Sequence, residues 1–208
     1  VVLACGGFEA NREWRATCLG PGWDLVKVRG SRYNTGDGIR MALEIGAQPY
    51  GQWSGCHATP DERNAPDFGD ANVGNSAQRH NYPLGIMVNG NGERFVDEAE
   101  DLRGRTYAKM GRAILAQPGG IAFQILDAKA RKLDIYPANY DKATTAKADT
   151  LEQLAGELEI NTANFVKTVR EFNAAIQPGT FNPDRHRLDG KGTAGIHPPK
   201  SNYSLSVE

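Results

Sequence analysis

The sequence predicts an α+β body over about residues 51–200, attached at both ends to pieces of another domain. Short strand patterns between residues 85 and 127 precede a helical last third, an order typical of α+β proteins. The apolar run 1–5 and the alternating run 203–208 each indicate a strand. Because these strands coincide with the two ends of the chain, we expect the 208 residues to be a piece of a longer polypeptide.

The first fifty residues carry two predicted helices. One helix is expected to begin at Asn11 and to end before an irregular connection at 20–34, which is rich in glycine. The second helix has Thr35 or Asp37 as its cap, and Gly46 fits just beyond its end.

The middle of the chain contains a long loop and a hairpin. Residues 54–82 are polar with little periodicity, and so long a loop in a compact domain is usually functional. The hairpin is formed by 85–89, a glycine-containing turn at 90–92, and 93–97.

The last third is mainly helical. A helix over about 104–116 and a strand at 121–127 come before it. Thr150 and Gln153 fit a capping box at a helix start. One apolar helix face is formed by Phe165, Val169, Phe172 and Ile176. Residues 177–200 then return to loop.

Composition and charge exclude several classes of function. The chain has 24 Lys and Arg against 25 Asp and Glu, so it lacks the basic footprint of non-specific nucleic-acid binding. No apolar run approaches the roughly 18 residues of a membrane span. Three cysteines without C-x-x-C spacing indicate a reducing, cytoplasmic compartment. Glycine is the outlier, with 19 of its 24 residues in 1–120, and indicates backbone close to a ligand.

Two glycine-containing segments are candidates for ligand binding: Ala4-Cys5-Gly6-Gly7 after the first strand, and Thr35-Gly36-Asp37-Gly38 at a helix start. Glycine lets backbone N–H groups approach a ligand, and a helix N-terminus favours phosphate. Alternatively, the first segment is a tight turn and the second an ordinary helix cap. Neither matches G-x-G-x-x-G or the P-loop, so the chain shows no nucleotide-binding motif of its own.

His57 follows Cys56 at the start of the long loop. A loop histidine can bind a carboxylate or take part in acid–base chemistry, although it is more often an ordinary surface residue. A Cys56–His57 thiol hydrolase is a further alternative, but neighbouring side chains point apart in an extended chain. We expect no metal site, because the four histidines show no recognisable ligand spacing.

Arg103 and Arg105 follow the acidic run 97–101. One interpretation is a solvated helix start with weak local ion pairs. The other is an arginine that is held by carboxylates and binds a carboxylate substrate with its planar fork. Composition does not separate the two.

Four segments in this order carry a family resemblance: Val1-Val2-Leu3-Ala4-Cys5-Gly6-Gly7-Phe8, Asn34-Thr35-Gly36-Asp37-Gly38-Ile39, Gly55-Cys56-His57, and Ile86 to Glu98. Together they resemble the fumarate reductase/succinate dehydrogenase flavoprotein family, and within it the tricarballylate dehydrogenase-like FAD-dependent oxidoreductases. The most specific stretch is Val88-Asn89-x-x-Gly92-x-Arg94-Phe95-Val96-x-Glu98. The resemblance covers nearly the whole chain.

The resemblance implies a domain organisation and a cofactor. Residues 51–200 would be the capping (catalytic) domain that closes over the flavin, whereas 1–50 and 201–208 would belong to an α/β FAD-binding domain. The residues it implies to lie on FAD are Ala4, Cys5, Gly6, Gly7, Thr35, Gly36, Asp37 and Gly38.

The resemblance also implies catalytic residues. His57 matches a substrate-binding histidine, and Arg103 matches the proton donor or acceptor, with Arg105 as the alternative. The family's Thr-Glu pair and neighbouring relay arginine have no match, and Gln78, Arg79 and His80 occupy that region. Since the family's G-x-G-x-x-G segment is absent from the sequence, we expect negligible FAD affinity in the isolated chain.

The expected function is therefore part of an FAD-dependent oxidoreductase that exchanges a hydride at flavin N5 with a small carboxylate, such as tricarballylate or a fumarate- or succinate-like acid. An electron-transfer partner is expected, but no nucleic acid or membrane span. The alternative is a non-catalytic binding or interaction module without redox activity of its own.

Overall fold

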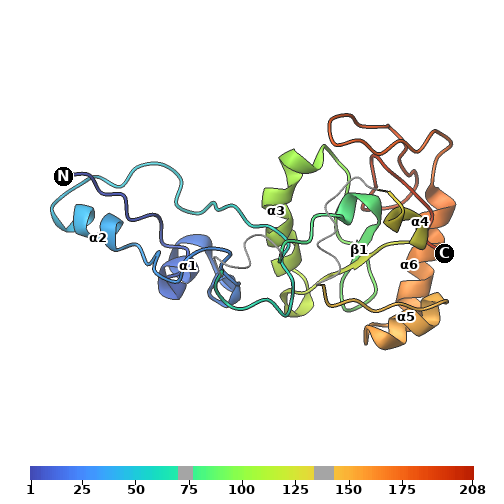
Figure 1. Ribbon diagram of the computed structural model, residues 1–208, viewed down its shortest axis with the longest axis horizontal. Coiled ribbons are helices and arrows are strands. Elements are labelled where there is room, and N and C mark those ends of the chain that lie inside the picture. The colour runs from blue at the N-terminus through green and yellow to red at the C-terminus, as the bar shows by residue number, and fades with distance from the viewer. Residues whose placement is uncertain (70–76, 134–142) are drawn as a thin grey trace. The chain divides into compact units, whose positions relative to one another are not determined.

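The computed structural model describes residues 1–69, 77–133 and 143–208 (Figure 1). They form two compact units: Val1–His57 with Asn64–Ala77, and Ala58–Arg63 with Gln78–Glu208. These bounds differ from the predicted 1–50, 51–200 and 201–208, and the assignment of those segments to domains of a larger enzyme stays a prediction. The part of the expected loop 54–82 that covers 70–76 lies outside the described residues.

The first unit holds two α-helices and a short 3-10 turn: α1 (Arg12–Leu19), η1 (Trp23–Leu25) and α2 (Asp37–Glu44). Both helices were predicted. Asn11 caps α1, because its side chain accepts a hydrogen bond from the Trp14 amide. Gly46, with φ of 92°, lies just beyond the end of α2 as expected.

The predicted cap of α2 is wrong. The N-cap is Gly36, which has no side chain, and the Thr35 hydroxyl donates to the Asp37 carboxylate instead of accepting from a helix N–H group. The predicted strand 1–5 is also wrong, because these residues form no strand and are exposed. A single extended segment needs a neighbouring strand for its N–H and C=O groups, and the described residues provide none here.

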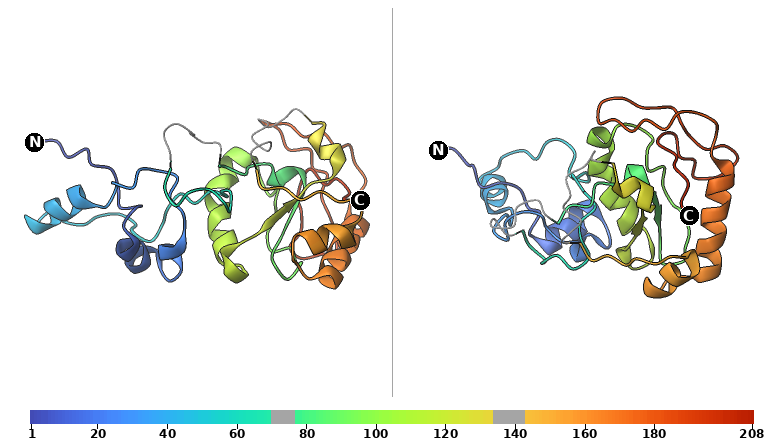
Figure 2. Two further views of the ribbon diagram at one scale, coloured as in Figure 1. Left: turned by 60° about the horizontal axis from the view of Figure 1, so that its bottom comes forward. Right: turned by 45° about the vertical axis from the view of Figure 1, so that its right-hand side comes forward.

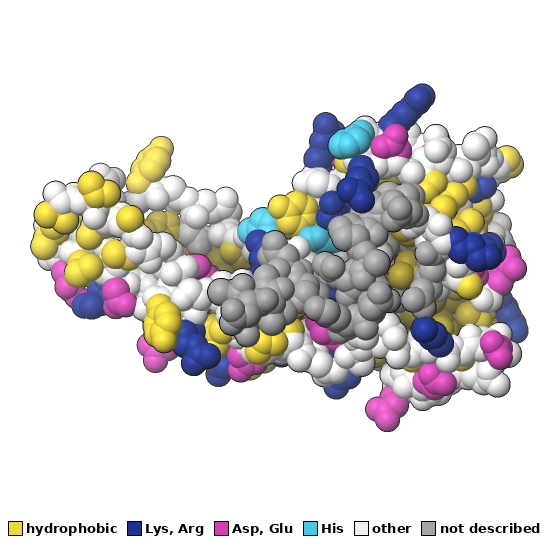
Figure 3. All heavy atoms as spheres, in the orientation of Figure 1, with side chains coloured by type: hydrophobic (Ala, Val, Ile, Leu, Met, Phe, Trp, Pro, Cys, Tyr) yellow, Lys and Arg dark blue, Asp and Glu magenta, His cyan; other side chains and the backbone are white. Residues whose placement is uncertain are grey.

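Exposed apolar side chains gather on the first unit (Figure 3). Of the large exposed hydrophobic residues in the described ranges, one belongs to the second unit and eight to the first: Val1, Val2, Leu3, Leu25, Tyr33, Met41, Ile45 and Tyr50.

The second unit is built in layers around a two-stranded antiparallel sheet, β1 (Ile86–Val88) and β2 (Phe123–Ile125), with Ile86 opposite Ile125. Side chains alternate between its faces, so Ile86 packs with α5 (Leu151–Glu157) and α6 (Thr162–Ala175), and Met87 packs with α3 (Arg103–Leu115). Figures 1 and 2 show α3 and α6 on opposite sides of this sheet. The mixed architecture agrees with an α+β class.

Three short elements complete the second unit: η2 (Tyr82–Leu84), η3 (Pro118–Gly120) and α4 (Ala128–Arg131). The predicted helix over 104–116 is confirmed as α3, and the strand at 121–127 is confirmed with shorter bounds as β2. The Thr150 hydroxyl accepts from the Gln153 amide at 3.2 Å, as the capping box predicts.

The predicted hairpin is only half present. The turn forms, since the Asn89 amide donates to the Glu93 carbonyl, but Arg94 makes a single bridge to Val88 and no second strand follows. The reason lies in Glu98, whose buried carboxylate accepts the Met87 amide at 2.8 Å. The Met87 amide belongs to β1, so it donates to a side chain and is not available for a hydrogen bond to a second strand.

The most specific stretch of the family resemblance is a structural anchor. Arg94 pairs with the buried Glu98 through Nη2 at 2.6 Å, and its Nη1 donates to the Pro198 carbonyl at 2.8 Å. Gly92 has φ of 77°, and a Cβ there would lie 2.6 Å from the Phe165 amide nitrogen at the start of α6. The motif thus ties β1, α6 and the loop before Lys200 together.

The C-terminal strand predicted at 203–208 is wrong as well. Tyr203 has φ of 50°, which interrupts an extended run. The segment is nevertheless buried, because the Asn173 side chain of α6 bonds both backbone groups of Val207, donating to its carbonyl at 2.7 Å and accepting from its amide at 3.0 Å. The Asn173 side chain thus makes the two backbone hydrogen bonds that a neighbouring strand would make with Val207.

Candidate functional site

The loop before α2 is held by the start of α1. The Asn11 side chain that caps α1 also donates to the Thr35 carbonyl at 3.0 Å. Gly36 has φ of 87°, and a Cβ there would lie 2.9 Å from the Trp14 ring and 3.0 Å from the Phe8 Cβ. The position therefore requires glycine for its conformation and for its packing.

The first residues of α2 lie against the segment that follows Ala4. A Cβ on Gly38 would lie 2.9 Å from the Cys5 Cβ and 3.0 Å from its sulfur. Only glycine lets these two segments approach so closely. Two of the segments predicted to bind the cofactor are thus neighbours within the first unit.

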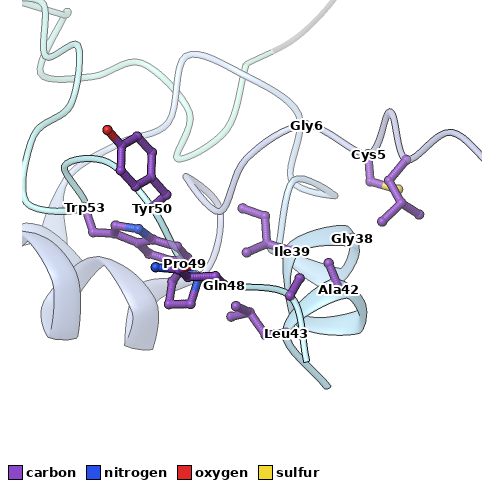
Figure 4. A pocket seen from close by; sticks show the side chains of 12 residues that line it. Cys5, Gly6, Gly38, Ile39, Ala42, Leu43, Gln48, Pro49, Tyr50 and Trp53 are labelled. Atoms are coloured by element: carbon purple, nitrogen blue, oxygen red, sulfur yellow. The ribbon is translucent and has the colours of Figure 1, made fainter. Parts of the chain in front are cut away.

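A pocket of about 310 Å³ opens where these segments meet (Figure 4). Its lining includes Cys5, Gly6 and Gly38 from the predicted cofactor segments, together with apolar and aromatic side chains of α2 and the following loop. Those further lining residues include Ile39, Leu43, Pro49, Tyr50 and Trp53. The remaining predicted residues, Ala4, Gly7, Thr35, Gly36 and Asp37, do not line it.

Electrostatics at the start of α2 favour a polar ligand atom. The Gly36 cap leaves the first N–H groups of the helix without a capping side chain. The Thr35 hydroxyl, and secondarily Arg40, lower the pKa of the exposed Asp37 carboxyl below its usual value. Asp37 is therefore ionised at neutral pH and carries a fixed negative charge beside the helix start.

A second cluster lies in the other unit around Arg103. Its Nη1 donates to Nδ1 of His80 at 2.9 Å, and Nε2 of His80 lies 2.5 Å from the Thr59 hydroxyl. The Tyr107 ring, one turn along α3, packs at 5.2 Å from the imidazole centroid. All four side chains are half-buried.

An ion pair is formed by Arg79, the residue directly before His80 in the sequence. Arg79 contacts the Glu62 carboxylate through Nη2 at 2.8 Å and Nε at 2.9 Å, with both side chains about one-tenth exposed. The Gln124 amide of β2 donates to the Arg79 carbonyl at 2.7 Å. This pair fixes the backbone that carries His80.

The two candidate arginines of α3 differ in surroundings. The Arg105 side chain is 70% exposed and makes only a long 3.4 Å ion pair with Asp101, whereas Arg103 is half-buried and contacts His80. His57 and Cys56 are both exposed and belong to the first unit. The structure thus distinguishes Arg103 from Arg105 by burial, while the roles of His57 and Arg103 stay predictions.

Sequence reasoning missed Thr59, Glu62 and His80 as neighbours of the candidate arginine. It named Arg79 and His80 only as occupying a region where a family motif is missing. No local pattern marks these residues, because 23 positions separate His80 from Arg103 and their contact depends on tertiary packing.

Comparison with known proteins identifies the class as FAD-dependent oxidoreductases. A family model described as the FAD binding domain matches residues 1–198, and the chain belongs to that family. FAD is the cofactor that this family binds. The tricarballylate dehydrogenase-like subgroup is not among the relatives reported below.

The chain is similar to curated enzymes with different substrates in their names. It is 33% identical over 181 residues to a probable fumarate reductase of Shewanella frigidimarina, covering 86% of this chain and 28% of that protein. It is 29% identical over 202 residues to a 4-oxocyclohexanecarboxylate 2-dehydrogenase of Sinomonas cyclohexanicum, covering 90% and 33%. The chain thus spans about a third of the length of these relatives.

The chain is also similar to solved structures of a fumarate reductase and a ketosteroid dehydrogenase. An open conformation of a flavocytochrome c3 fumarate reductase matches with a TM-score of 0.62 and 32% identity over 85% of this chain and 29% of that one. A 3-ketosteroid delta1-dehydrogenase from Sterolibacterium denitrificans matches with a TM-score of 0.65 and 26% identity over 100% of this chain and 39% of that one.

The size and lining of the pocket in the first unit are compatible with one ring of FAD, and its role as the cofactor site stays a prediction. Its volume is at the lower end of the roughly 300–1,000 Å³ of small-molecule sites, and its apolar and aromatic walls suit a planar ring. Gly38 lets α2 pack directly against Cys5, so both residues line the pocket.

The described residues contain neither a metal-binding cluster nor a membrane-spanning helix. Within residues 1–69, 77–133 and 143–208, no group of three or more His, Cys, Asp or Glu is arranged to hold a metal ion. In the same ranges, no helix is both long and apolar enough to cross a membrane.

Proposed function

We propose that the chain is part of an FAD-dependent oxidoreductase that acts on a small carboxylate, such as tricarballylate or a fumarate- or succinate-like acid. Family membership supports the redox chemistry, and the similar fumarate reductase supports the substrate class. The observation that carries the proposal is the half-buried guanidinium of Arg103, held by His80 in the second unit.

Bound FAD would supply the two-electron chemistry by exchanging a hydride at flavin N5. The protein would supply the rest. Reduction of a C=C bond adds the hydride to one carbon and a proton to its neighbour, and dehydrogenation removes both. Arg103 would deliver or accept that proton, and His57 would orient a carboxylate of the substrate.

Cofactor binding is proposed for the pocket of the first unit, with Cys5, Gly6 and Gly38 against the flavin nucleotide. The exposed apolar surface of this unit would be covered by further parts of a longer flavoprotein. We therefore expect negligible FAD affinity in residues 1–208 alone. Stoichiometric flavin in this purified chain would contradict that expectation.

Location and partners follow from the same proposal. Cys5, Cys18 and Cys56 form no disulfide among the described residues, which is compatible with the proposed cytoplasmic, reducing compartment. An electron-transfer protein would exchange electrons with the flavin. A non-catalytic binding module remains the alternative that the next experiment tests.

The deciding experiment uses Arg103→Gln in the complete FAD-loaded protein, assayed with fumarate, succinate and tricarballylate. We expect turnover to fall by at least about 10²-fold with FAD still bound, because the proton-transfer group is lost. The matched control is Arg105→Gln, two residues along α3, which should keep wild-type turnover because Arg105 is 70% exposed. Absence of turnover in the wild type with all three acids would favour the binding module.

A further inference from the structure

His80 contacts the candidate catalytic arginine directly, and the contact fixes the proton on its ring. A guanidinium has only donors, so Nδ1 of His80 must accept the bond from Nη1 of Arg103 and carries no hydrogen. A neutral imidazole then bears its hydrogen on Nε2. That N–H donates to the Thr59 hydroxyl at 2.5 Å.

These contacts hold the imidazole on three sides. Arg103 and Tyr107 come from α3, whereas Thr59 comes from the short segment 58–63, which packs on α3 by two backbone hydrogen bonds of Ala58. The Ala58 amide donates to the Ala108 carbonyl at 2.7 Å, and its carbonyl accepts from the Gly111 amide at 2.9 Å. The ring is thus contacted by α3 and by the segment that packs on α3.

We propose that His80 is a positioning residue for Arg103, and that Thr59 orients His80. The inference rests on the proposed function, because it needs Arg103 as the group that exchanges a proton with the substrate. A free arginine side chain samples many rotamers, and a bound acceptor restricts them. A single neutral acceptor at Nη1 fixes the plane of the guanidinium without neutralising its charge.

The neighbouring arginine does not replace His80 in this role. The Arg79 guanidinium is bound to the Glu62 carboxylate, and that ion pair holds the chain segment before His80. Glu62 also accepts from the Thr144 amide at 3.3 Å. His80, the residue that follows Arg79, contacts Arg103 directly.

The first arm of the test measures kcat and KM in the complete FAD-loaded protein. His80→Ala should lower kcat by about 10²-fold with little change in KM, because misplacement of a catalytic group by about 1 Å has an effect of that size. His80→Asn should restore kcat, since the asparagine oxygen occupies the position of Nδ1. His80→Gln should not, because its oxygen corresponds to Nε2.

Thr59 provides a matched pair of variants. Thr59→Val removes the acceptor for the Nε2 hydrogen and keeps the shape of the side chain, so kcat should fall. Thr59→Ser keeps the hydroxyl and should retain wild-type kcat.

The second arm does not depend on activity. In protein with ¹⁵N-labelled histidine, the NMR signals lost in His80→Asn identify the ring, and the wild type should show a bare Nδ1 and a protonated Nε2. Arg103→Leu should shift the Nδ1 signal, because the donor to Nδ1 is removed, whereas Nε2 keeps its hydrogen and donates it to the Thr59 hydroxyl.

The outcomes separate the two hypotheses. If Arg103→Gln abolishes turnover while His80→Ala keeps wild-type kcat, the positioning role is wrong and the proposed function stands. If Arg103→Gln keeps turnover, the proposed function is wrong. Should His80→Ala fail to fold, equal kcat in His80→Asn and His80→Gln, or a hydrogen on Nδ1 in the wild type, overturns the inference.

Discussion

Replacement of Lys200 should change how the stability of the second unit depends on pH. Its ammonium is fully buried, donates to the Gly85 carbonyl at 2.5 Å and lies 5.9 Å from the centroid of the Phe172 ring. Burial lowers the pKa of Lys200 from 10.5 to about 8, although the nearby Glu98 carboxylate opposes this shift.

The size and sign of the effect follow from proton linkage. Between about pH 8 and pH 10.5 the unfolded chain keeps the Lys200 proton and the folded chain has released it, so stability rises with pH. Below about pH 8 both states are protonated, and the cost of the buried charge is fully present. From pH 7 to pH 9.5 the lysine should add about 2 kcal/mol to the free energy of unfolding, because each pH unit above the folded pKa contributes about 1.4 kcal/mol.

The assay is urea unfolding of the wild type and Lys200→Met at pH 7 and pH 9.5, followed by circular dichroism. The wild type should gain about 2 kcal/mol relative to the variant between these pH values. Lys167→Met, at a side chain that is 71% exposed, is the control. Its free energy of unfolding should change between the two pH values by the same amount as that of the wild type. If the free energy of unfolding of Lys200→Met changes with pH by the same amount as that of the wild type, Lys200 does not titrate in this range and the reasoning is refuted.

Two further substitutions test the packing of the second unit, each by urea unfolding. Gly85→Ala should destabilise by at least about 3 kcal/mol, because its Cβ would lie 2.0 Å from the Ile125 carbonyl oxygen. Gly104→Ala, where a Cβ meets nothing within 4 Å, should instead leave stability unchanged or raise it, and equal losses in both would contradict the argument. Asn173→Ala should reduce stability by about 1–3 kcal/mol through the loss of both bonds to the Val207 backbone, and an unchanged unfolding midpoint would show that these bonds contribute nothing.

The helices were predictable because their signals are local. Along α6 the residues Phe165, Val169 and Phe172 are buried as their spacing predicts, and Thr150 caps α5 as its motif predicts. Amphipathic spacing and caps lie within a few residues of the helix they specify. Tertiary contacts are not needed to recognise them.

The strands at the ends were not predictable in the same way. An apolar or alternating run indicates that a segment can be a strand, but a strand forms only with a partner. Residues 1–5 have none among the described residues, and Val207 bonds the Asn173 side chain instead. The second strand of the predicted hairpin is absent for a related reason, because the Met87 amide donates to the Glu98 carboxylate instead of to a neighbouring strand.

The pocket was partly predictable. Glycine spacing and the family resemblance indicated Cys5, Gly6 and Gly38, which line it. The apolar wall formed by Tyr50 and Trp53 carried no motif. Such wall residues are chosen for shape and hydrophobicity, which many sequences satisfy, so a single sequence does not mark them.

The choice between Arg103 and Arg105 shows where sequence information ends. Two residues along an α-helix are rotated by about 200°, so the two side chains point to nearly opposite sides of α3. In the structure Arg103 is half-buried, whereas the Arg105 side chain is 70% exposed. His80, 23 positions away, lies on the side of Arg103, and Asp101, four positions away, pairs with Arg105 at the surface. Asp101 is nearer in the sequence, but its exposed ion pair with Arg105 contributes little to stability. The contact with the distant His80 is what distinguishes Arg103 as the candidate catalytic residue.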